Sequence, residues 1–145
     1  HYSYRVLFRR SPLREPYGWV VRQRTFNITA LQREAQLFLG EHDFLPFSFP
    51  RPEMEHTLCT IHRIDVVEEE SAVVIHFYAN RYLHHMVRAM VGHLVDVAKG
   101  LLPEGSASEI LNGTTAGPRR WAPAQGLTLE SVSYERPAEQ QTLSH

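Results

Sequence analysis

The spacing of apolar residues changes abruptly in the middle of this 145-residue chain, and that change limits the folds open to it. Between residues 73 and 79 apolar side chains line one face at a period of two, as in a half-buried strand. From Tyr82 to Lys99 the period becomes three to four, so the apolar residues share one face of a helix. These residues are Leu83, Met86, Val87, Met90, Val91, Leu94, Val97 and Ala98. The pattern predicts a strand followed directly by an amphipathic helix.

Other segments have the composition of strands. The β-branched run from Thr57 to Val67 ends at an acidic turn and predicts the first half of a hairpin with residues 73–79. Strands are also predicted over Tyr2–Phe8, over Trp19–Arg22 and from Leu127 to about Tyr134. Residues 40–47 are aromatic and irregular and are followed by further prolines, so we expect a loop there.

Capping boxes predict two additional helices. Thr29 is followed three residues later by Gln32, and the helical spacing that follows stops at Gly40. Ser106 and Glu109 repeat the pattern ahead of a shorter helix.

Strand hairpins combined with packed helices predict an α+β fold, with helices on one face of a mostly antiparallel sheet. A hydrophobic content of 43% and a length of 145 residues suit one compact domain. We expect this domain to cover residues 1–136, followed by a polar tail over residues 137–145.

Several classes of protein are excluded by composition. No apolar run approaches the roughly 18 to 20 residues of a membrane span, and the N-terminus lacks a signal-peptide pattern, so a cytoplasmic protein is expected. The lone Cys59 rules out an internal disulfide framework. The chain starts at His1 instead of a methionine, which indicates a fragment or a processed piece.

Charge is distributed unevenly although the net charge is only -1. The first 24 residues contain six arginines and a single acidic residue, Glu15. The arginines are Arg5, Arg9, Arg10, Arg14, Arg22 and Arg24. Such a basic end can contact phosphates, although a GC-rich genome would also enrich arginine.

Residue chemistry alone predicts no metal site. His84, His85 and His93 do not have the four-residue spacing that places a zinc pair on one helical face. Of the three aspartates, only Asp43 has a suggestive setting, beside Glu41 and a histidine. That setting is consistent with an acid/base pair or with an ordinary loop-capping role.

Two other features are open to more than one interpretation. Arg88 lies off the apolar arc of the long helix, one turn before Gly92, and is either a surface residue or part of a site. Tyr2 and Tyr4 share one face of a strand, where aromatic rings either stack on a nucleobase or fill the core.

Four motifs, in order, resemble the C-terminal part of TruA-type tRNA pseudouridine synthases. They are Tyr2-Ser3-Tyr4, Gly40 to Phe44 with Phe47 beyond it, Tyr82 to Gly92, and Ala122 to Tyr134. The resemblance covers nearly the whole chain and implies the pseudouridine synthase fold, with tRNA, at its anticodon stem-loop, as the substrate. It also implies a homodimer, and chemistry that needs no metal or redox cofactor.

The resemblance further implies roles for individual residues. Tyr2 matches the tyrosine that stacks on the target uracil and is implicated in removing the C5 proton. Arg88 matches the arginine that pairs with the catalytic aspartate and holds the flipped base. Substrate-binding roles are implied for Tyr4, Arg5, His84 and His85.

Two departures from the family pattern affect function. The family's Arg-Thr-Ile triplet is replaced by Cys59-Thr60-Ile61, so the contact made by that arginine is absent. The Gly-Arg-Thr-Asp motif, whose aspartate starts the reaction, does not occur in the chain and is expected in a missing N-terminal half. We therefore expect this chain alone to be inactive, with Arg88 either mobile or held by a substitute partner. The alternatives are a non-catalytic RNA-binding or scaffold protein, and a small-ligand domain unrelated to RNA.

Overall fold

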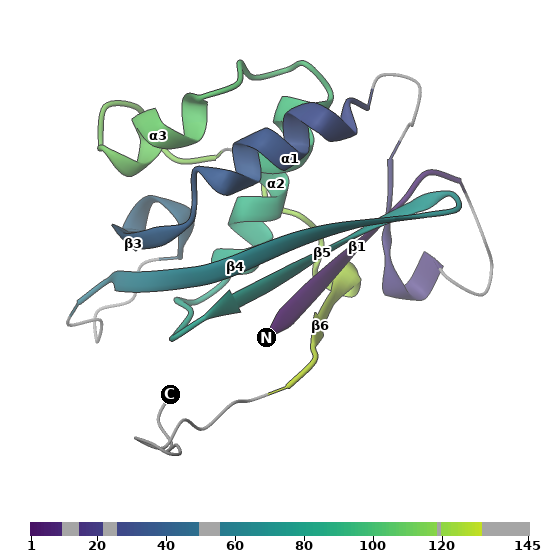
Figure 1. The fold of residues 1–145 in the computed structure, drawn as a ribbon, viewed down its shortest axis with the longest axis horizontal. Helices are drawn as coiled ribbons and strands as arrows, with labels where there is room; N and C mark the ends of the chain where they lie inside the picture. The colour runs from purple at the N-terminus through teal and green to yellow at the C-terminus, as the bar shows by residue number, and fades with distance from the viewer. Residues whose placement is uncertain (10–14, 22–25, 50–55, 119, 132–145) are drawn as a thin grey trace.

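The computed structural model describes residues 1–9, 15–21, 26–49, 56–118 and 120–131, and these form a mixed sheet with three α-helices (Figure 1). The strands are β1 (Tyr2–Leu7), β2 (Trp19–Val20), β3 (Gly40–Asp43), β4 (Leu58–Glu69), β5 (Ala72–Ala79) and β6 (Leu127–Leu129). The helices are α1 (Ile28–Gln36), α2 (Met86–Ala98) and α3 (Ser106–Leu111). The predicted α+β class is confirmed.

The sheet has the order β2-β1-β5-β4-β3, and β6 also pairs with β1. The β4–β5 hairpin forms its centre, as Figure 1 shows, and β1 runs antiparallel to β5 with Tyr2 opposite Phe77. Among the described pairings only β1–β2 is parallel, with Val6 opposite Trp19. The prediction of a mostly antiparallel sheet is therefore confirmed.

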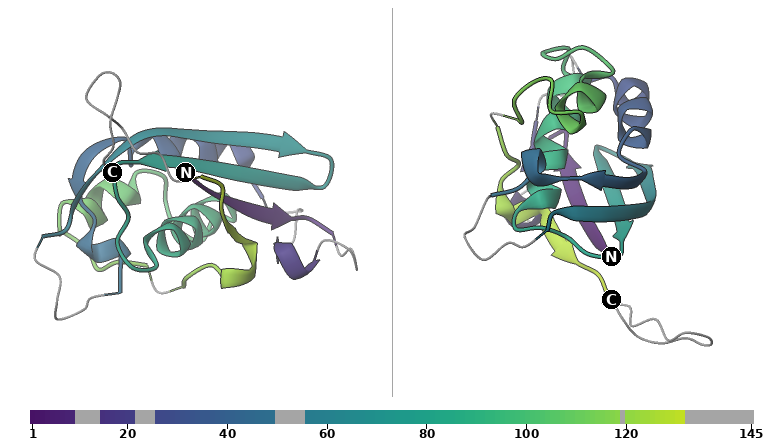
Figure 2. Two further views of the ribbon diagram at one scale, coloured as in Figure 1. Left: turned by 90° about the horizontal axis from the view of Figure 1, so that it is seen from below. Right: turned by 90° about the vertical axis from the view of Figure 1, so that its left-hand side faces the viewer.

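One hydrophobic core joins one face of this sheet to the helices. Alternate residues of β1 and β5, such as Tyr4, Ile75 and Phe77, are fully buried and belong to the same cluster as Leu31 of α1 and Leu94 of α2. Figure 2 shows α2 and α3 on one side of the β4–β5 hairpin. The period-two and period-3.6 patterns of the sequence correspond to these two buried faces.

The predicted loop at residues 40–44 is wrong in part, because Gly40–Asp43 forms the edge strand β3. Gly40 pairs with Ile61 of β4, and Asp43 pairs with Leu58. Gly40 has a φ of 95°, which a glycine adopts without steric cost. A short, polar edge strand buries little apolar surface, so it has no alternating pattern from which the sequence could reveal it.

Both predicted capping boxes are wrong. The cap of α1 is Asn27, whose side chain accepts a hydrogen bond from the backbone N–H of Ala30 over 3.0 Å. The residue that caps α3 is Gly105, and the hydroxyl of Ser106 donates instead to the carbonyl oxygen of Pro103 over 2.7 Å. In both helices a residue close to the expected cap, Asn27 or Gly105, takes the cap position instead. The capping-box motif alone therefore did not predict the first residue of either helix.

The other element boundaries differ from the predictions at their ends. α2 begins at Met86 and not at Tyr82, because His85 has a left-handed backbone with a φ of 61°. The described part of β6 ends at Leu129, and the remainder of the strand predicted there reaches residues outside the described ones. Arg22 and the polar tail over residues 137–145 also lie outside them. Among the described residues, no helix combines the length and apolar character needed to span a membrane.

Candidate functional site

A cavity of about 420 Å³ lies where the start of β1 meets the N-terminal end of α2. Its described lining residues are Tyr2, Tyr82, Leu83, His84, His85, Met86, Val87 and Leu127. Its volume falls within the range of roughly 300–1,000 Å³ typical of small-ligand pockets. The fold thus brings together Tyr2 and the histidine pair, which are about eighty residues apart along the chain.

Tyr2 is half-buried and is braced by Tyr82. The two rings meet edge to face, with centroids 4.8 Å apart and an angle of 84° between their planes. The hydroxyl of Tyr82 donates to the carbonyl oxygen of Phe77 over 2.8 Å, and burial raises the pKa of Tyr82 to about 12. Sequence reasoning did not single out Tyr82, although it is the first residue of the motif that contains Arg88.

His84 and His85 form a stack beside the cavity. Their ring centroids lie 3.8 Å apart, and the ring planes are inclined by only 24°. His85 precedes the first residue of α2, and its carbonyl oxygen accepts from the N–H of Ala89 over 3.0 Å. The helix N-terminus carries a partial positive charge, so this end of the cavity favours an anionic ligand.

Arg88 is held against the segment that precedes η4 (Ala124–Gly126). Its Nε–H donates to the carbonyl oxygen of Ala122 over 2.8 Å, and the N–H of Ala122 donates to the carbonyl oxygen of Arg88 over 3.0 Å. A Cβ on Gly92 would lie 2.1 Å from the carbonyl oxygen of Arg120, so the segment can cross α2 only because residue 92 is a glycine. The substitute partner expected for Arg88 is therefore a backbone carbonyl.

Tyr4 and Arg5 lie away from the cavity. Tyr4 is fully buried, and its hydroxyl donates to the carbonyl oxygen of Pro123 over 2.5 Å. Burial raises the pKa of Tyr4, and the positive charge of Arg88 opposes this effect more weakly. Arg5 extends from the other face of β1 and pairs with Glu69 over 2.7 Å. The structure does not group these two residues with Tyr2.

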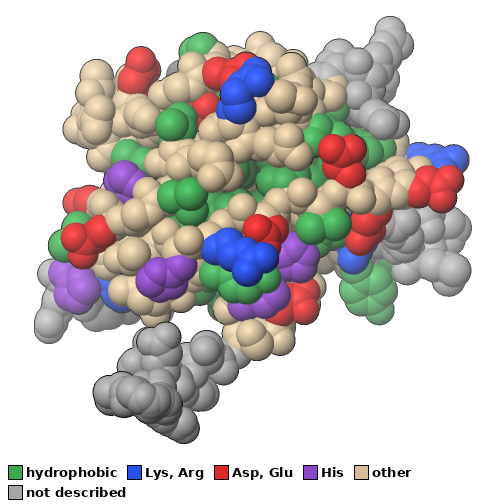
Figure 3. Space-filling model, in the orientation of Figure 1, with side chains coloured by type: hydrophobic (Ala, Val, Ile, Leu, Met, Phe, Trp, Pro, Cys, Tyr) green, Lys and Arg blue, Asp and Glu red, His purple; other side chains and the backbone are tan. Residues whose placement is uncertain are grey.

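The basic N-terminal stretch is only partly described. Arg9 donates to the hydroxyl of Ser71 over 2.8 Å and lies 4.0 Å from Glu70, so Arg9, like Arg5, contacts the acidic β4–β5 turn. The four other arginines, Arg10, Arg14, Arg22 and Arg24, lie outside the described residues. On the face drawn in Figure 3, acidic and basic side chains are interspersed. The described part of the stretch is therefore offset by nearby carboxylates.

All three aspartates are engaged away from the cavity. One oxygen of Asp43 accepts from the hydroxyl of Thr57 over 2.5 Å and from the N–H of Leu45 over 3.0 Å, which is the loop-capping role. Asp65 and Asp96 are paired with arginines, at 2.8 Å and 3.9 Å respectively. Consequently, none of the described residues that line the cavity carries a carboxylate.

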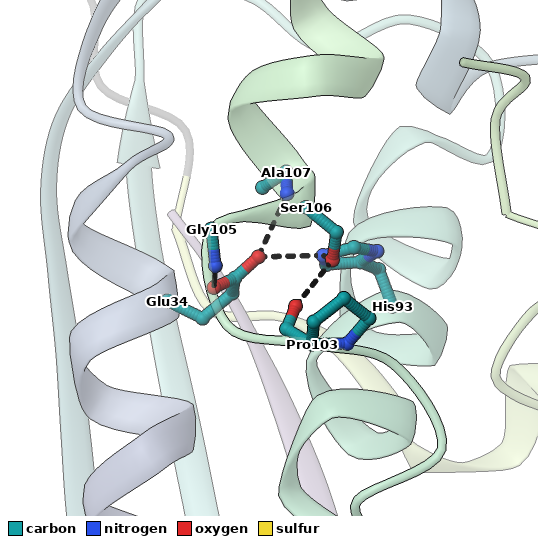
Figure 4. A network of polar contacts seen from close by, with 6 residues as sticks. All are labelled: Glu34, His93, Pro103, Gly105, Ser106 and Ala107. Atoms are coloured by element: carbon teal, nitrogen blue, oxygen red, sulfur yellow. Dashed lines mark hydrogen bonds and ion pairs between the residues drawn. The ribbon is translucent and has the colours of Figure 1, made fainter.

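Apart from the cavity, a buried polar cluster that the sequence did not reveal joins the three helices through Glu34 (Figure 4). Glu34 is 1% exposed, and its carboxylate accepts from the backbone N–H groups of Gly105 and Ala107 over 2.7 and 2.8 Å. It also contacts Nε2 of the fully buried His93 over 2.8 Å. Burial acts to raise the pKa of Glu34, but these hydrogen bonds outweigh it and lower the pKa.

Fold and cavity together define an α+β domain with an aromatic site at one end of its sheet. A family model described as tRNA pseudouridine synthase matches residues 35–135, which is more than half of the chain. The chain belongs to this family.

Several curated relatives agree with this assignment. The tRNA pseudouridine synthase A of Neorickettsia sennetsu is 37% identical over 139 residues, covering 92% of this chain and 55% of the relative. That of Methylobacterium sp. is 36% identical over 142 residues, covering 94% and 56%. The tRNA pseudouridine synthase A 1 of Bacillus cereus is 33% identical over 144 residues, covering 92% and 55%. The chain thus spans just over half the length of the relatives it matches.

Proposed function

We propose that this chain forms the uridine-binding part of a tRNA pseudouridine synthase that acts on the anticodon stem-loop. The observation that carries the proposal is the placement of Tyr2 on the wall of a cavity large enough to admit a nucleobase, beside the helix that carries Arg88. Family membership supports the proposed reaction, and the position of Tyr2 on the cavity wall supports the proposed base site. The intact protein is proposed to act as a homodimer in the cytoplasm, where tRNA is available.

The reaction constrains what the site must do. The bond between C1′ of the ribose and N1 of uracil breaks, the base turns, and a bond from C1′ to C5 forms. C5 then loses its proton to a base or to solvent, while N1 gains one. Because product and substrate are isomers, the net reaction consumes no oxidant or reductant.

Tyr2 is proposed to hold the turning base and to help remove the C5 proton. Extracting a uridine from its stack costs a few kcal/mol, and stacking on an aromatic ring returns roughly 1–3 kcal/mol per base. The edge-on contact with Tyr82, which is itself fixed by its hydrogen bond to Phe77, holds the ring of Tyr2 in place. Tyr82 is therefore proposed as a positioning residue for Tyr2.

Arg88 is proposed to pair with a carboxylate supplied by the part of the protein that this chain does not cover. Its Nε–H donates to the carbonyl oxygen of Ala122. The other N–H groups of the guanidinium can still form a bidentate pair with a carboxylate. Tyr4 is proposed to act indirectly, because its hydroxyl fixes Pro123 next to Ala122. His84 and His85 are proposed to contact the RNA at the cavity mouth, and Arg5 is proposed to contact the RNA outside the cavity.

The proposal is tested first by sequencing upstream of His1 for Gly-Arg-Thr-Asp, and then by assaying the full-length enzyme. Tritium on C5 of uridine is released as the new bond forms, so release from anticodon stem-loop RNA measures turnover directly. Arg88→Ala is expected to slow release by about ten- to hundredfold, which corresponds to one lost charge-assisted hydrogen bond. The affinity for tRNA should fall by less than the rate of release does.

The absence of a carboxylate among the described lining residues also favours a second candidate, an RNA-binding protein without catalytic activity. A start codon immediately upstream of His1 would support this candidate. In that case no tritium is released, and Arg88→Ala changes only the affinity for RNA.

A further inference from the structure

Four rings form an aromatic cluster beside the cavity: Phe49, His84, His85 and Trp121. The ring of Phe49 lies 6.0 Å from that of His84, 6.1 Å from that of His85 and 6.0 Å from that of Trp121. Trp121 also meets His85 edge to face at 5.3 Å. Three separate segments of the chain, residues 49, 84–85 and 121, thus supply rings to one place.

The aromatic cluster is held in position by the backbone. The N–H of Phe49 donates to the carbonyl oxygen of His84 over 3.1 Å, which joins the end of the 44–49 segment to the histidine stack. Trp121 lies between Arg120, which crosses α2 over Gly92, and Ala122, which is bonded to Arg88. Rings on such anchored backbone lose little conformational entropy when they bind a ligand.

Two rings of the aromatic cluster are exposed, whereas His85 and Trp121 are half-buried, and the cluster adjoins the cavity. Phe49 is 53% exposed, and His84, the outer ring of the histidine stack, is also exposed. His84 and His85 line the cavity as well, so a ligand in the cavity lies next to these rings. The nearby N-terminus of α2 favours a ligand that carries negative charge.

We propose that the aromatic cluster binds one unpaired nucleobase that neighbours the target uridine in the RNA. This inference rests on the proposed function and extends it by naming a second base-binding subsite. Exposed rings stack on any base, and proteins recognise RNA mainly through unpaired bases splayed onto such rings. A base together with its phosphate matches both the exposed rings and the positive end of the helix.

The test uses the fluorescence of Trp121 in a Trp19→Phe background, because these are the two tryptophans of the chain. The 145-residue chain is titrated with an RNA hairpin that has an unpaired loop, and with a duplex that has the loop sequence fully paired. Stacking on Trp121 is expected to quench its emission with the hairpin and not with the duplex. Phe49→Leu and Trp121→Leu, read by fluorescence anisotropy of labelled RNA, are each expected to weaken hairpin binding by about five- to hundredfold.

Tyr17→Leu is the matched control, because it removes a ring that is 68% exposed outside the aromatic cluster and should leave the affinity unchanged. Circular dichroism is used to check that each variant is folded before its affinity is compared. The aromatic subsite would be overturned, and the proposed function left standing, by two results together. The hairpin would bind without quenching Trp121 emission, and neither leucine substitution would change the affinity for the hairpin. A parent chain that self-associates in sedimentation, together with a Phe49→Leu variant that does not and that keeps its RNA affinity, would overturn the subsite in favour of a protein contact. Absence of any salt-sensitive RNA binding would instead reject the proposed function itself, and the subsite with it.

Discussion

Arg88 and Ala122 are joined by two hydrogen bonds that run in opposite directions. The guanidinium Nε–H of Arg88 donates to the carbonyl oxygen of Ala122 over 2.8 Å, and the N–H of Ala122 donates to the carbonyl oxygen of Arg88 over 3.0 Å. The pair fixes the segment containing Trp121 across α2, above Gly92. The proposed catalytic arginine and the proposed base-stacking tryptophan are therefore parts of one rigid unit.

Gly92→Ala should disrupt this unit. The new Cβ would lie 2.1 Å from the carbonyl oxygen of Arg120, which is a backbone atom that cannot rotate away. Alanine adds about 1 kcal/mol of helix propensity, but overpacking typically costs about 1–3 kcal/mol, and a clash with backbone falls at the upper end of that range. We expect net destabilisation in urea unfolding, together with a changed Trp121 emission in the Trp19→Phe background. A variant with unchanged or higher stability would show that the segment can move at little cost.

Arg88→Ala should lower the free energy of unfolding by about 1.5–3 kcal/mol, the usual effect of losing a hydrogen bond from a charged group. Arg33→Ala is the matched control, since Arg33 and its partner Glu104 are both largely exposed, 2.9 Å apart. An exposed pair of this kind contributes little to stability. Equal effects of the two substitutions in urea unfolding would contradict a specific role for the Arg88–Ala122 pair.

The parts of the fold that bury a regular apolar face were predictable from the sequence. The β4–β5 hairpin and α2 follow from period-two and period-3.6 spacing, because in each the buried face repeats along the element. Edge strand β3 and the caps of α1 and α3 were not predictable. A polar edge strand is selected by its pairing with β4, and a cap is selected by backbone conformations that several neighbouring residues could adopt.

The candidate site, like the fold, was predictable from the sequence only in part. The motif containing Arg88 and the pattern Tyr2-Ser3-Tyr4 indicated which segments to compare, but only the fold shows that Tyr2 lines the cavity while Tyr4 is buried beneath residues 123–126. Tyr82 and Trp121 were not singled out because their contacts, with Tyr2 and with Phe49 and His85, are tertiary ones that local spacing does not reveal. The contact between Glu34 and His93 spans fifty-nine positions of sequence, and no local spacing could indicate it.

Tyr82→Phe should reveal the buried hydroxyl through the alkaline pH dependence of stability. Burial raises the pKa of Tyr82 in the folded state to about 12, whereas the unfolded chain releases the proton near the ordinary value of about 10. The folded state therefore binds more protons above pH 10, and its stability falls as the pH rises from 10 to 12. The phenylalanine variant should be about 1 kcal/mol less stable than the parent at pH 8, with the difference shrinking at pH 11. A difference independent of pH in urea titrations would indicate that the hydroxyl ionises as it does in water.

Glu34→Gln should destabilise the junction of the three helices. Each carboxylate oxygen of Glu34 faces a backbone donor, at Gly105 and Ala107, so the NH₂ of glutamine would face an N–H in either orientation. We expect a loss of about 3 kcal/mol at pH 7, as when one partner of a buried charged contact is removed. Glu104→Gln is the control, because its exposed pair with Arg33 should change stability little.

The acid pH dependence distinguishes the charge of Glu34 from its shape. Its pKa is lowered in the folded state, so its contribution is complete above the ordinary glutamate value of about 4.3 and is lost as the pH falls toward the lowered value. The stability difference between the parent chain and Glu34→Gln should therefore shrink as the pH falls below about pH 4. Urea unfolding at pH 7, 5 and 3.5 measures this directly. A difference that persists undiminished at pH 3.5 would mean that packing, and not the ionised carboxylate, holds α1 to the start of α3.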